Sequence, residues 1–107
     1  MKTTFETIIR GHQEAFQKTF DPAQYEVLDK MAHAILHSLK AGHKLLLCGN
    51  GGSASDSQHI AAEFVGRFEK NRMSLPAIAL TSDIAALTAI VNDFGFEKVF
   101  SRHVEGL

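Results

Sequence analysis

The sequence predicts an α/β fold with a doubly wound parallel sheet, preceded by two amphipathic helices. Two apolar runs, residues 45–48 and 75–80, are too short for helices and lack polar alternation, as is typical of parallel strands buried on both faces. A helical pattern follows each run, so the order strand, helix, strand, helix predicts a right-handed parallel unit. Because two strands cannot bury both faces of a sheet, we expect this 107-residue chain to be either a fragment of a longer protein or completed by partner chains, and we favour the fragment.

Charge and composition exclude several classes of function. The formal net charge of −1 provides no basic surface for nucleic acid or an anionic membrane. The N-terminus is charged and amphipathic, and no apolar run is long enough to span a bilayer. The single cysteine, Cys48, cannot form an internal disulfide, which agrees with a reducing compartment. We therefore expect a cytoplasmic protein with neither nucleic acid nor membrane as a direct partner.

Two amphipathic helices precede the first strand. The first has apolar residues on one face: Phe5, Ile8, Ile9, Ala15 and Phe16. Asp21 and Pro22 begin the second as N-cap and first helical residue, and Gly42 ends it. Its apolar stripe is Val27, Leu28, Met31, Ile35 and Leu39. Long helices placed before an α/β core often pair with another subunit, so we expect residues 1–42 to form oligomer contacts and residues 43–107 to form the domain itself.

The stretch 44–63 contains a glycine-rich turn between the first strand and its helix. Gly49, Gly51 and Gly52 allow positive φ and close approach of a ligand. Ser53 and Ser55 follow where the helix should begin, and Ser55 with Gln58 matches a capping box. Such a turn directs backbone N–H groups and the positive end of a helix dipole beyond the strand. It predicts a binding site for a phosphate or a polyhydroxyl sugar.

The second half of the chain repeats the pattern. Residues 67–72 form a charged connector, and Pro76 stands at the start of the second strand, where a missing donor costs least. Asp83 caps a third helix, which gives way near residues 92–95. Residues 97–104 predict a fourth short helix with Gly106 as its C-cap.

His59 and Glu63 are the best candidates for chemistry, because their spacing places both on one face of a helix. Ala62 and Gly66 share that face and would keep a space open there. The opposite arc should pack on the sheet, and it consists of Ile60, Ala61, Phe64, Val65 and Phe68. Imidazole and carboxylate at this spacing suit two ligands of a tetrahedral zinc, or proton transfer with Glu63 as the base. A surface histidine hydrogen-bonded to a glutamate has the same spacing, and the spacing alone does not decide between them.

Several other residues have both a binding and a structural interpretation. Asn50 forms a turn or binds a sugar hydroxyl, and Ser53 caps the helix or donates to a phosphate. Asn92 and Asp93 should leave the third helix at the sheet edge where ligands of α/β folds gather, or merely end that helix. Arg67 pairs with an anion or solvates a helix end, and Cys48 is expected to be a small core residue. No acidic or cysteine partner stands out at a ligand spacing for the remaining histidines, so we expect them at the surface or in an interface; they are His12, His33, His37, His43 and His103.

Taken together, these motifs resemble bacterial phosphoheptose isomerase, the sedoheptulose-7-phosphate isomerase group of the sugar isomerase (SIS) domain superfamily. The residues that carry the resemblance occur in the family's order and spacing: residues 48–54, Asp56, Gln58, His59, Glu63, Gly66, Arg67, and residues 76–80, 92–96 and 100–102. The resemblance extends from about the second helix to the last residue. It implies a SIS-type sheet.

The resemblance also implies an activity and roles for individual residues. Sedoheptulose 7-phosphate would be isomerised to D-glycero-D-manno-heptose 7-phosphate, towards lipopolysaccharide heptose, by a proton that moves between C1 and C2 through an enediolate. His59 and Glu63 would bind one zinc per subunit, and Glu63 would also be the base. Family members are homotetramers with active sites between subunits. The substrate contacts would be Asn50, Gly51, Gly52, Ser53, Glu63, Asn92 and Asp93.

The sequence departs from the family at its end. The family's serine/threonine-rich phosphate loop and its late glutamine and histidine do not occur in these residues, so we expect little or no isomerase activity from the 107-residue chain alone. One alternative is a non-catalytic SIS protein that binds the bacterial replication initiator, and such relatives tend to lack a carboxylate at Glu63. Another is a sugar-phosphate-sensing module, which would have no need of His59 and Glu63. The presence of Glu63 favours the enzyme.

Overall fold

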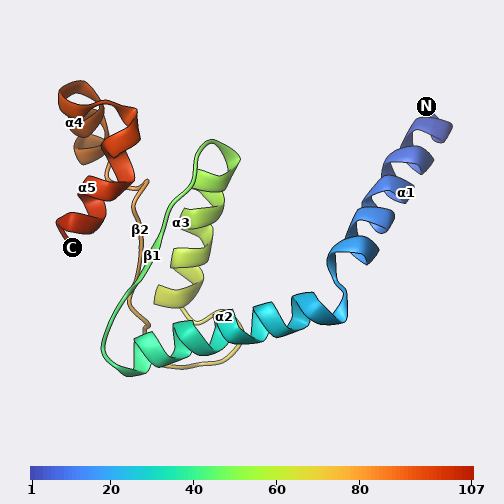
Figure 1. Cartoon of the computed structure of the whole chain (residues 1–107), viewed down its shortest axis with the longest axis horizontal. Helices are drawn as coiled ribbons and strands as arrows, with labels where there is room; N and C mark the ends of the chain where they lie inside the picture. Colours follow the sequence, from blue (N-terminus) through green and yellow to red (C-terminus); the bar gives the residue numbers. More distant parts are fainter. The chain divides into compact units, whose positions relative to one another are not determined.

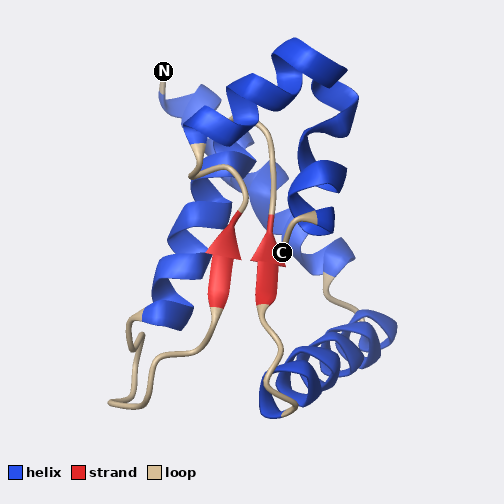
Figure 2. Cartoon of the chain, turned by 90° about the vertical axis from the view of Figure 1, so that its left-hand side faces the viewer, coloured by secondary structure: helices blue, strands red, loops and turns tan.

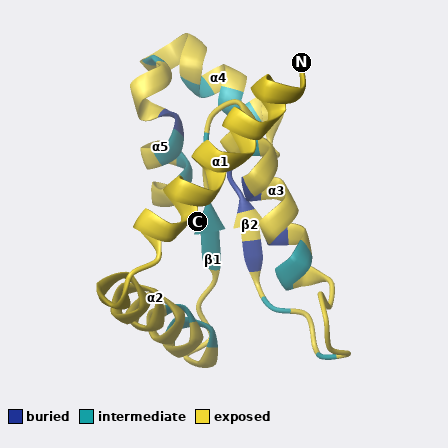
Figure 3. Cartoon of the chain, turned by 90° about the vertical axis from the view of Figure 1, so that its right-hand side faces the viewer, coloured by how far each residue is buried: buried dark blue, intermediate teal, exposed yellow.

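The N-terminal unit consists of two long helices that bury none of their own residues. The computed structural model describes residues 1–107 and divides into Met1–His37 and Ser38–Leu107, each described here by itself. Helix α1 spans Lys2–Thr19 and α2 spans Pro22–Lys40, and Figure 3 colours almost all of both as exposed. The predicted cap of α2 is confirmed, because the carboxylate of Asp21 accepts a hydrogen bond of 3.0 Å from the Gln24 N–H. The functional boundary predicted between residues 42 and 43 stays a prediction.

The second unit is built on two parallel strands, as predicted. Strand β1 (Leu45–Leu47) pairs with β2 (Ala77–Ala79) in the register Leu45 to Ala77 and Leu47 to Ala79, and Figure 2 shows the two strands side by side. Both are shorter than expected. The prediction that β1 is buried on both faces is wrong, because a sheet of two strands leaves each with a free edge, and β1 is only half-buried. No helix in the chain is both long and apolar enough to cross a membrane.

Helices lie on both sides of the strands, which confirms the doubly wound arrangement. Helix α3 (Gly52–Val65) lies on one side, and α4 (Ile84–Phe94) and α5 (Val99–Glu105) lie on the other (Figure 1). The Asp83 carboxylate caps α4 through a 2.9 Å bond from the Ala86 N–H, and Gly95, with φ of 87°, ends it. The short helix predicted at residues 97–104 is confirmed, preceded by a 3₁₀ turn, η1 (Phe96–Lys98).

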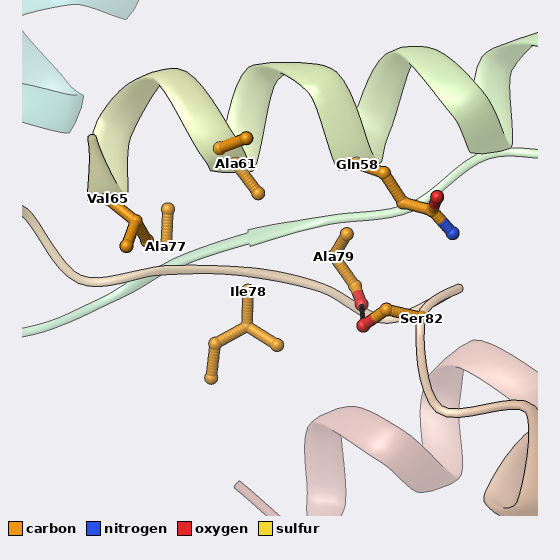
Figure 4. Close-up of a pocket in the computed structure, with 8 residues that line it drawn as sticks. Gln58, Ala61, Val65, Ala77, Ile78, Ala79 and Ser82 are labelled. Carbon is orange, nitrogen blue, oxygen red and sulfur yellow. Dashed lines mark hydrogen bonds between the residues drawn. The ribbon is translucent and has the colours of Figure 1, made fainter. Parts of the chain in front are cut away.

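Small side chains make the core between α3 and the sheet. Ala61 of α3 packs against Ala77 and Ala79 of β2, while Ile78 between them points away from α3 (Figure 4). Leu45, Leu47 and Phe64 pack against this cluster. Three alanines let the helix backbone come close to the strands, so α3 is held at a short distance from the sheet.

The predicted packing arc of α3 is only partly correct. Ala61 and Phe64 do face the sheet, together with the buried Ser57, but Ile60 and Val65 are 42% and 52% exposed and lie on the flanks. Phe68 is exposed because it follows the end of the helix at Val65. The buried stripe is therefore narrower than the apolar residues alone suggest.

Candidate functional site

The loop between β1 and α3 requires glycine at two of its three predicted positions. Gly51 has φ of 57°, which other residues adopt with strain. A Cβ at Gly49 would lie 2.5 Å from the carbonyl oxygen of Ser53, so the loop folds back against the first turn of the helix. Gly52 has neither constraint, because its φ is not positive and no atom lies within 4 Å of the position that a Cβ would take. The backbone therefore explains two glycines and leaves the third open to a role in binding.

The predicted capping box is wrong. Helix α3 begins at Gly52 with Gly51 as its N-cap and no side-chain cap, so Ser53 and Ser55 lie within the first turn. The reason is that the positive φ of Gly51 turns the chain into the helix before the serines are reached. The N–H groups of Gly51 and Gly52 and the hydroxyl of Ser53 consequently donate to no acceptor in this chain. With the positive end of the helix dipole behind them, they can hold an anion or a sugar hydroxyl.

His59 and Glu63 come together on α3 as predicted. The Nε2 atom of His59 lies 3.5 Å from Oε1 of Glu63, and the two side chains are 76% and 39% exposed. At 100° per residue they project opposite the buried stripe of Ser57 and Ala61, on the same side as Gly52. Glu63 is thus partly shielded, while its histidine partner is open to solvent.

The open space predicted beside this pair lies elsewhere. A cavity of about 320 Å³ runs along the flank of α3 next to β2, and its lining contains neither His59 nor Glu63 (Figure 4). Ala62 lines it, because Ala62 lies on that flank between the polar stripe and the sheet. The cavity walls are mostly apolar, so it is not the polar site that the pair was expected to face.

The pair fits part of a metal site. An imidazole nitrogen and a carboxylate oxygen are donors that zinc accepts, and they lie close enough to share one ion. No group of three or more histidine, cysteine, aspartate or glutamate side chains in the chain could hold a metal. His59 and Glu63 therefore supply two of the three or four protein ligands that zinc sites use.

Asn92 and Asp93 do not leave α4 as predicted, since both lie in its last turn. Their exposed side chains bond to each other, with Nδ2 of Asn92 donating to Oδ1 of Asp93 at 2.9 Å. Helix α4 does start at the carboxyl end of β2, the sheet edge that also carries the glycine loop, but these two residues stand at its far end. No hydrogen bond or ion pair joins them to the loop or to Glu63.

Three side-chain hydrogen bonds that sequence reasoning missed connect α3 to the segments around it. Near its start, the Thr81 hydroxyl donates to the Ala54 carbonyl at 3.3 Å, and Gln58 donates to the Thr81 carbonyl at 3.3 Å. At its end, Arg72 of the connector donates to the carbonyl of Glu63 at 2.8 Å. The sequence contains no local signal for this bond, because Arg67 lies nearer to the helix end and Arg72 reaches it only where the connector folds back.

The other candidates need three corrections. Cys48 is exposed and follows the strand, so it is not a core residue. His103 is half-buried in α5, with Nδ1 2.9 Å from the Val99 carbonyl oxygen and its Nε2 buried without a partner. His33 does have an acidic partner at ligand spacing, because its Nδ1 lies 3.4 Å from the carboxylate of Asp29. Arg67 is exposed and forms no hydrogen bond in the chain.

Comparisons with known proteins agree with this arrangement. The family model described as the SIS domain matches residues 11–106. The chain is 56% identical over 96 residues to a phosphoheptose isomerase of Nitratiruptor sp., covering 90% of this chain and 51% of that relative. It is 50% identical over 107 residues to a phosphoheptose isomerase of Aliarcobacter butzleri, covering 100% of this chain and 56% of that relative.

A solved structure aligns over the same extent. The phosphoheptose isomerase of Neisseria gonorrhoeae matches with a TM-score of 0.77 and 44% identity, over 99% of this chain and 52% of that one. The chain thus spans about half the length of the relatives it matches. Since the family model covers nearly all of the sequence, the chain belongs to the SIS domain family, in which the relatives it resembles are phosphoheptose isomerases.

Proposed function

We propose that the full-length protein that carries this chain is an aldose–ketose isomerase that converts sedoheptulose 7-phosphate to D-glycero-D-manno-heptose 7-phosphate, a step towards lipopolysaccharide heptose. The observation that carries the proposal is the partly shielded Glu63 beside His59, on a helix that begins at a glycine loop with unbonded N–H groups. The identity of 50% to 56% to phosphoheptose isomerases supports the substrate.

In this proposal Glu63 moves the proton. Its carboxylate takes a proton from one of the two carbons C1 and C2 of the substrate and returns it to the other, so that an enediolate forms and collapses. The imidazole of His59, 3.5 Å away, orients that carboxylate. Asn50, the N–H groups of Gly51 and Gly52, and the Ser53 hydroxyl bind substrate oxygens at the start of the helix.

Asn92 and Asp93 form a second polar group for the same substrate. Their amide and carboxylate are already bonded to each other and exposed, so each has further hydrogen-bonding capacity for sugar hydroxyls. This role is an extension of the family resemblance.

Zinc is the cofactor we propose, with His59 and Glu63 as two of its ligands and the others from residues outside this chain. When bound, zinc would polarise the substrate oxygens next to the carbon that loses its proton. The donor chemistry supports the assignment. A carboxylate held by a cation is a weaker base, so the metal and base roles of Glu63 compete, and we expect one of them to dominate in each step of the cycle.

The proposal includes a homotetramer with active sites between subunits. Helices α1 and α2 expose large apolar side chains that water disfavours, including Phe5 at 61%, Ile8 at 63% and Met31 at 55%. Moreover, Glu63 lies roughly 16 Å along α3 from the free N–H of Gly52, which is a long reach for one small substrate. In an active site between subunits, the glycine loop of one copy and Glu63 of another would contact the same substrate. We place the enzyme in the cytoplasm, which agrees with its free Cys48.

Turnover by the purified full-length protein tests this proposal. Sedoheptulose 7-phosphate should be converted to the aldose, and sedoheptulose without the phosphate, as the control, should be converted far less efficiently. Binding of sedoheptulose 7-phosphate with no product after prolonged incubation would contradict the enzyme and support the sensing module. Absence of both binding and turnover would favour the non-catalytic alternative.

A further inference from the structure

The end of helix α3 leaves carbonyl groups that need partners. The last four carbonyls of any helix have no N–H donor within that helix. In α3 they include the carbonyls of Glu63 and Phe64. The Ala62 carbonyl accepts a 2.7 Å bond from the N–H of Gly66, which ends the helix. The carbonyl of Glu63 instead depends on a side chain from the connector that follows.

That side chain is Arg72, whose guanidinium bonds to more carbonyls than any other side chain in the chain. Its Nη2 donates to the Glu63 carbonyl at 2.8 Å, and its Nη1 donates to the Phe64 carbonyl at 2.9 Å. The same Nη1 reaches the carbonyls of Met73 at 2.9 Å and Gly66 at 3.2 Å. A planar, permanently charged fork can bridge adjacent carbonyls in this way, and its charge is favourable at the negative end of a helix dipole.

The rest of the connector shows that charge alone does not explain these bonds. Arg67, Glu69 and Lys70 occupy the same stretch and form no hydrogen bond. The chain also returns to the helix end through the N–H of Leu75, which donates to the Phe64 carbonyl at 3.1 Å. Arg72 is therefore the one charged residue of the connector whose side chain is hydrogen-bonded to the last turn of α3.

We propose that Arg72 is the positioning residue for Glu63. The guanidinium holds the turn that carries Glu63, whereas His59 lies one turn earlier, where the helix is closed by its own backbone bonds. Loss of Arg72 should loosen Glu63 and leave His59 in place. The inference deepens the proposed function and rests on it for the consequence in catalysis, but the restraint on the helix end stands on the geometry alone.

Amide hydrogen exchange in the full-length protein tests the restraint. Arg72→Gln should speed exchange of the amides of residues 63–66 by about tenfold, because charge-assisted bonds to two helix carbonyls are lost, and leave those of residues 57–60 unchanged. Arg72→Lys should give an intermediate effect, since it keeps the charge and loses the fork. Lys70→Gln, a matched change in the same connector, should alter exchange neither at residues 63–66 nor at residues 57–60. Unchanged exchange in Arg72→Gln would overturn the inference.

A double-mutant cycle tests whether Arg72 acts through Glu63. In Arg72→Gln, kcat for sedoheptulose 7-phosphate should fall while KM changes little, and the further loss should be much smaller when Glu63→Asp is already present. Equal losses in both backgrounds would overturn the positioning role, because they would indicate general destabilisation. Failure of the proposed function gives a different result: the parent would not turn over sedoheptulose 7-phosphate, while Arg72→Gln would still speed exchange at residues 63–66.

Discussion

Two histidine–carboxylate pairs in this chain have the same spacing and different surroundings. In α2, Nδ1 of His33 lies 3.4 Å from the Asp29 carboxylate, and both side chains are more than 70% exposed. In α3, Nε2 of His59 lies 3.5 Å from Glu63, which is only 39% exposed. The distances are nearly equal, so spacing and contact do not identify a site.

The contexts of the two pairs do differ. The backbone carbonyl of Asp29 lies 2.9 Å from Nδ1 of its partner His33. Helix α2 begins with a conventional aspartate cap, Asp21. Glu63 has its carbonyl held by Arg72 from outside the helix, and α3 begins at a glycine loop with unbonded N–H groups. A partly shielded carboxylate, with its backbone carbonyl bonded to Arg72, on a helix whose first N–H groups are unbonded, is what distinguishes the candidate site from a surface pair.

Substitution of the two carboxylates should have the most unequal effect. In the full-length protein, Glu63→Gln should lower kcat for sedoheptulose 7-phosphate by about 10² to 10⁴, because the amide cannot accept the proton. Asp29→Asn should stay within about twofold of the parent, as expected of an exposed residue away from the site. Steady-state turnover measures both. Similar losses in the two variants would remove the distinction between the pairs.

The two histidines should differ in metal binding. His59→Ala should weaken zinc binding at least about tenfold, because the loss of an outer-shell partner alone already costs about that much. His33→Ala should leave zinc binding unchanged. Zinc content after dialysis, measured by atomic emission on the full-length protein, checks this without any assay of activity. Equal zinc in His59→Ala and the parent would refute the proposed site.

Glycine substitutions separate the fold of the loop from its binding role. Gly49→Ala should destabilise the protein by about 1–3 kcal/mol, because the methyl group meets the backbone of Ser53. Gly52→Ala has open space and should leave the thermal midpoint unchanged, yet raise KM several-fold if its N–H lies against substrate. Thermal denaturation and kinetics give the two readings. An unchanged KM in Gly52→Ala would exclude Gly52 from the site.

The smallest effect concerns the stability of the α2 pair. Asp29→Asn should cost about 0.2–0.5 kcal/mol, because exposed pairs at this spacing contribute little. The loss should shrink in high salt, which screens exposed charges. Urea denaturation in low and high salt measures it. A loss of several kcal/mol would mean that the α2 pair also has a specific structural role.

Much of the fold could be predicted because its signals are local. The cap at Asp21, the cap at Asp83 and the stop at Gly95 each depend on one or two side chains and their immediate backbone. The parallel pairing followed from two apolar runs with a helix between them. Local chemistry determines these features, so a single sequence is sufficient to read them.

The predictions failed where the backbone conformation or a contact distant in sequence decides the outcome. The capping box failed because the backbone at Gly51 had already begun the helix. Cys48 is exposed because the strand ends at Leu47, and Arg72 reaches α3 only because the connector folds back on it. The i, i+4 spacing is the same for His59 with Glu63 and for His33 with Asp29, and it does not show that only Glu63 is partly shielded.

Solvent deuterium exchange tests most directly whether Glu63 moves the substrate proton. Full-length parent, Glu63→Gln and Asp29→Asn would each be incubated with sedoheptulose 7-phosphate in D₂O, and deuterium at C1 and C2 followed by NMR. The parent and Asp29→Asn should introduce deuterium at these carbons, because a carboxylate that takes up the proton can exchange it with solvent, and Glu63→Gln should introduce none. Deuterium incorporation by Glu63→Gln at the parental rate would contradict the assignment of Glu63 as the base.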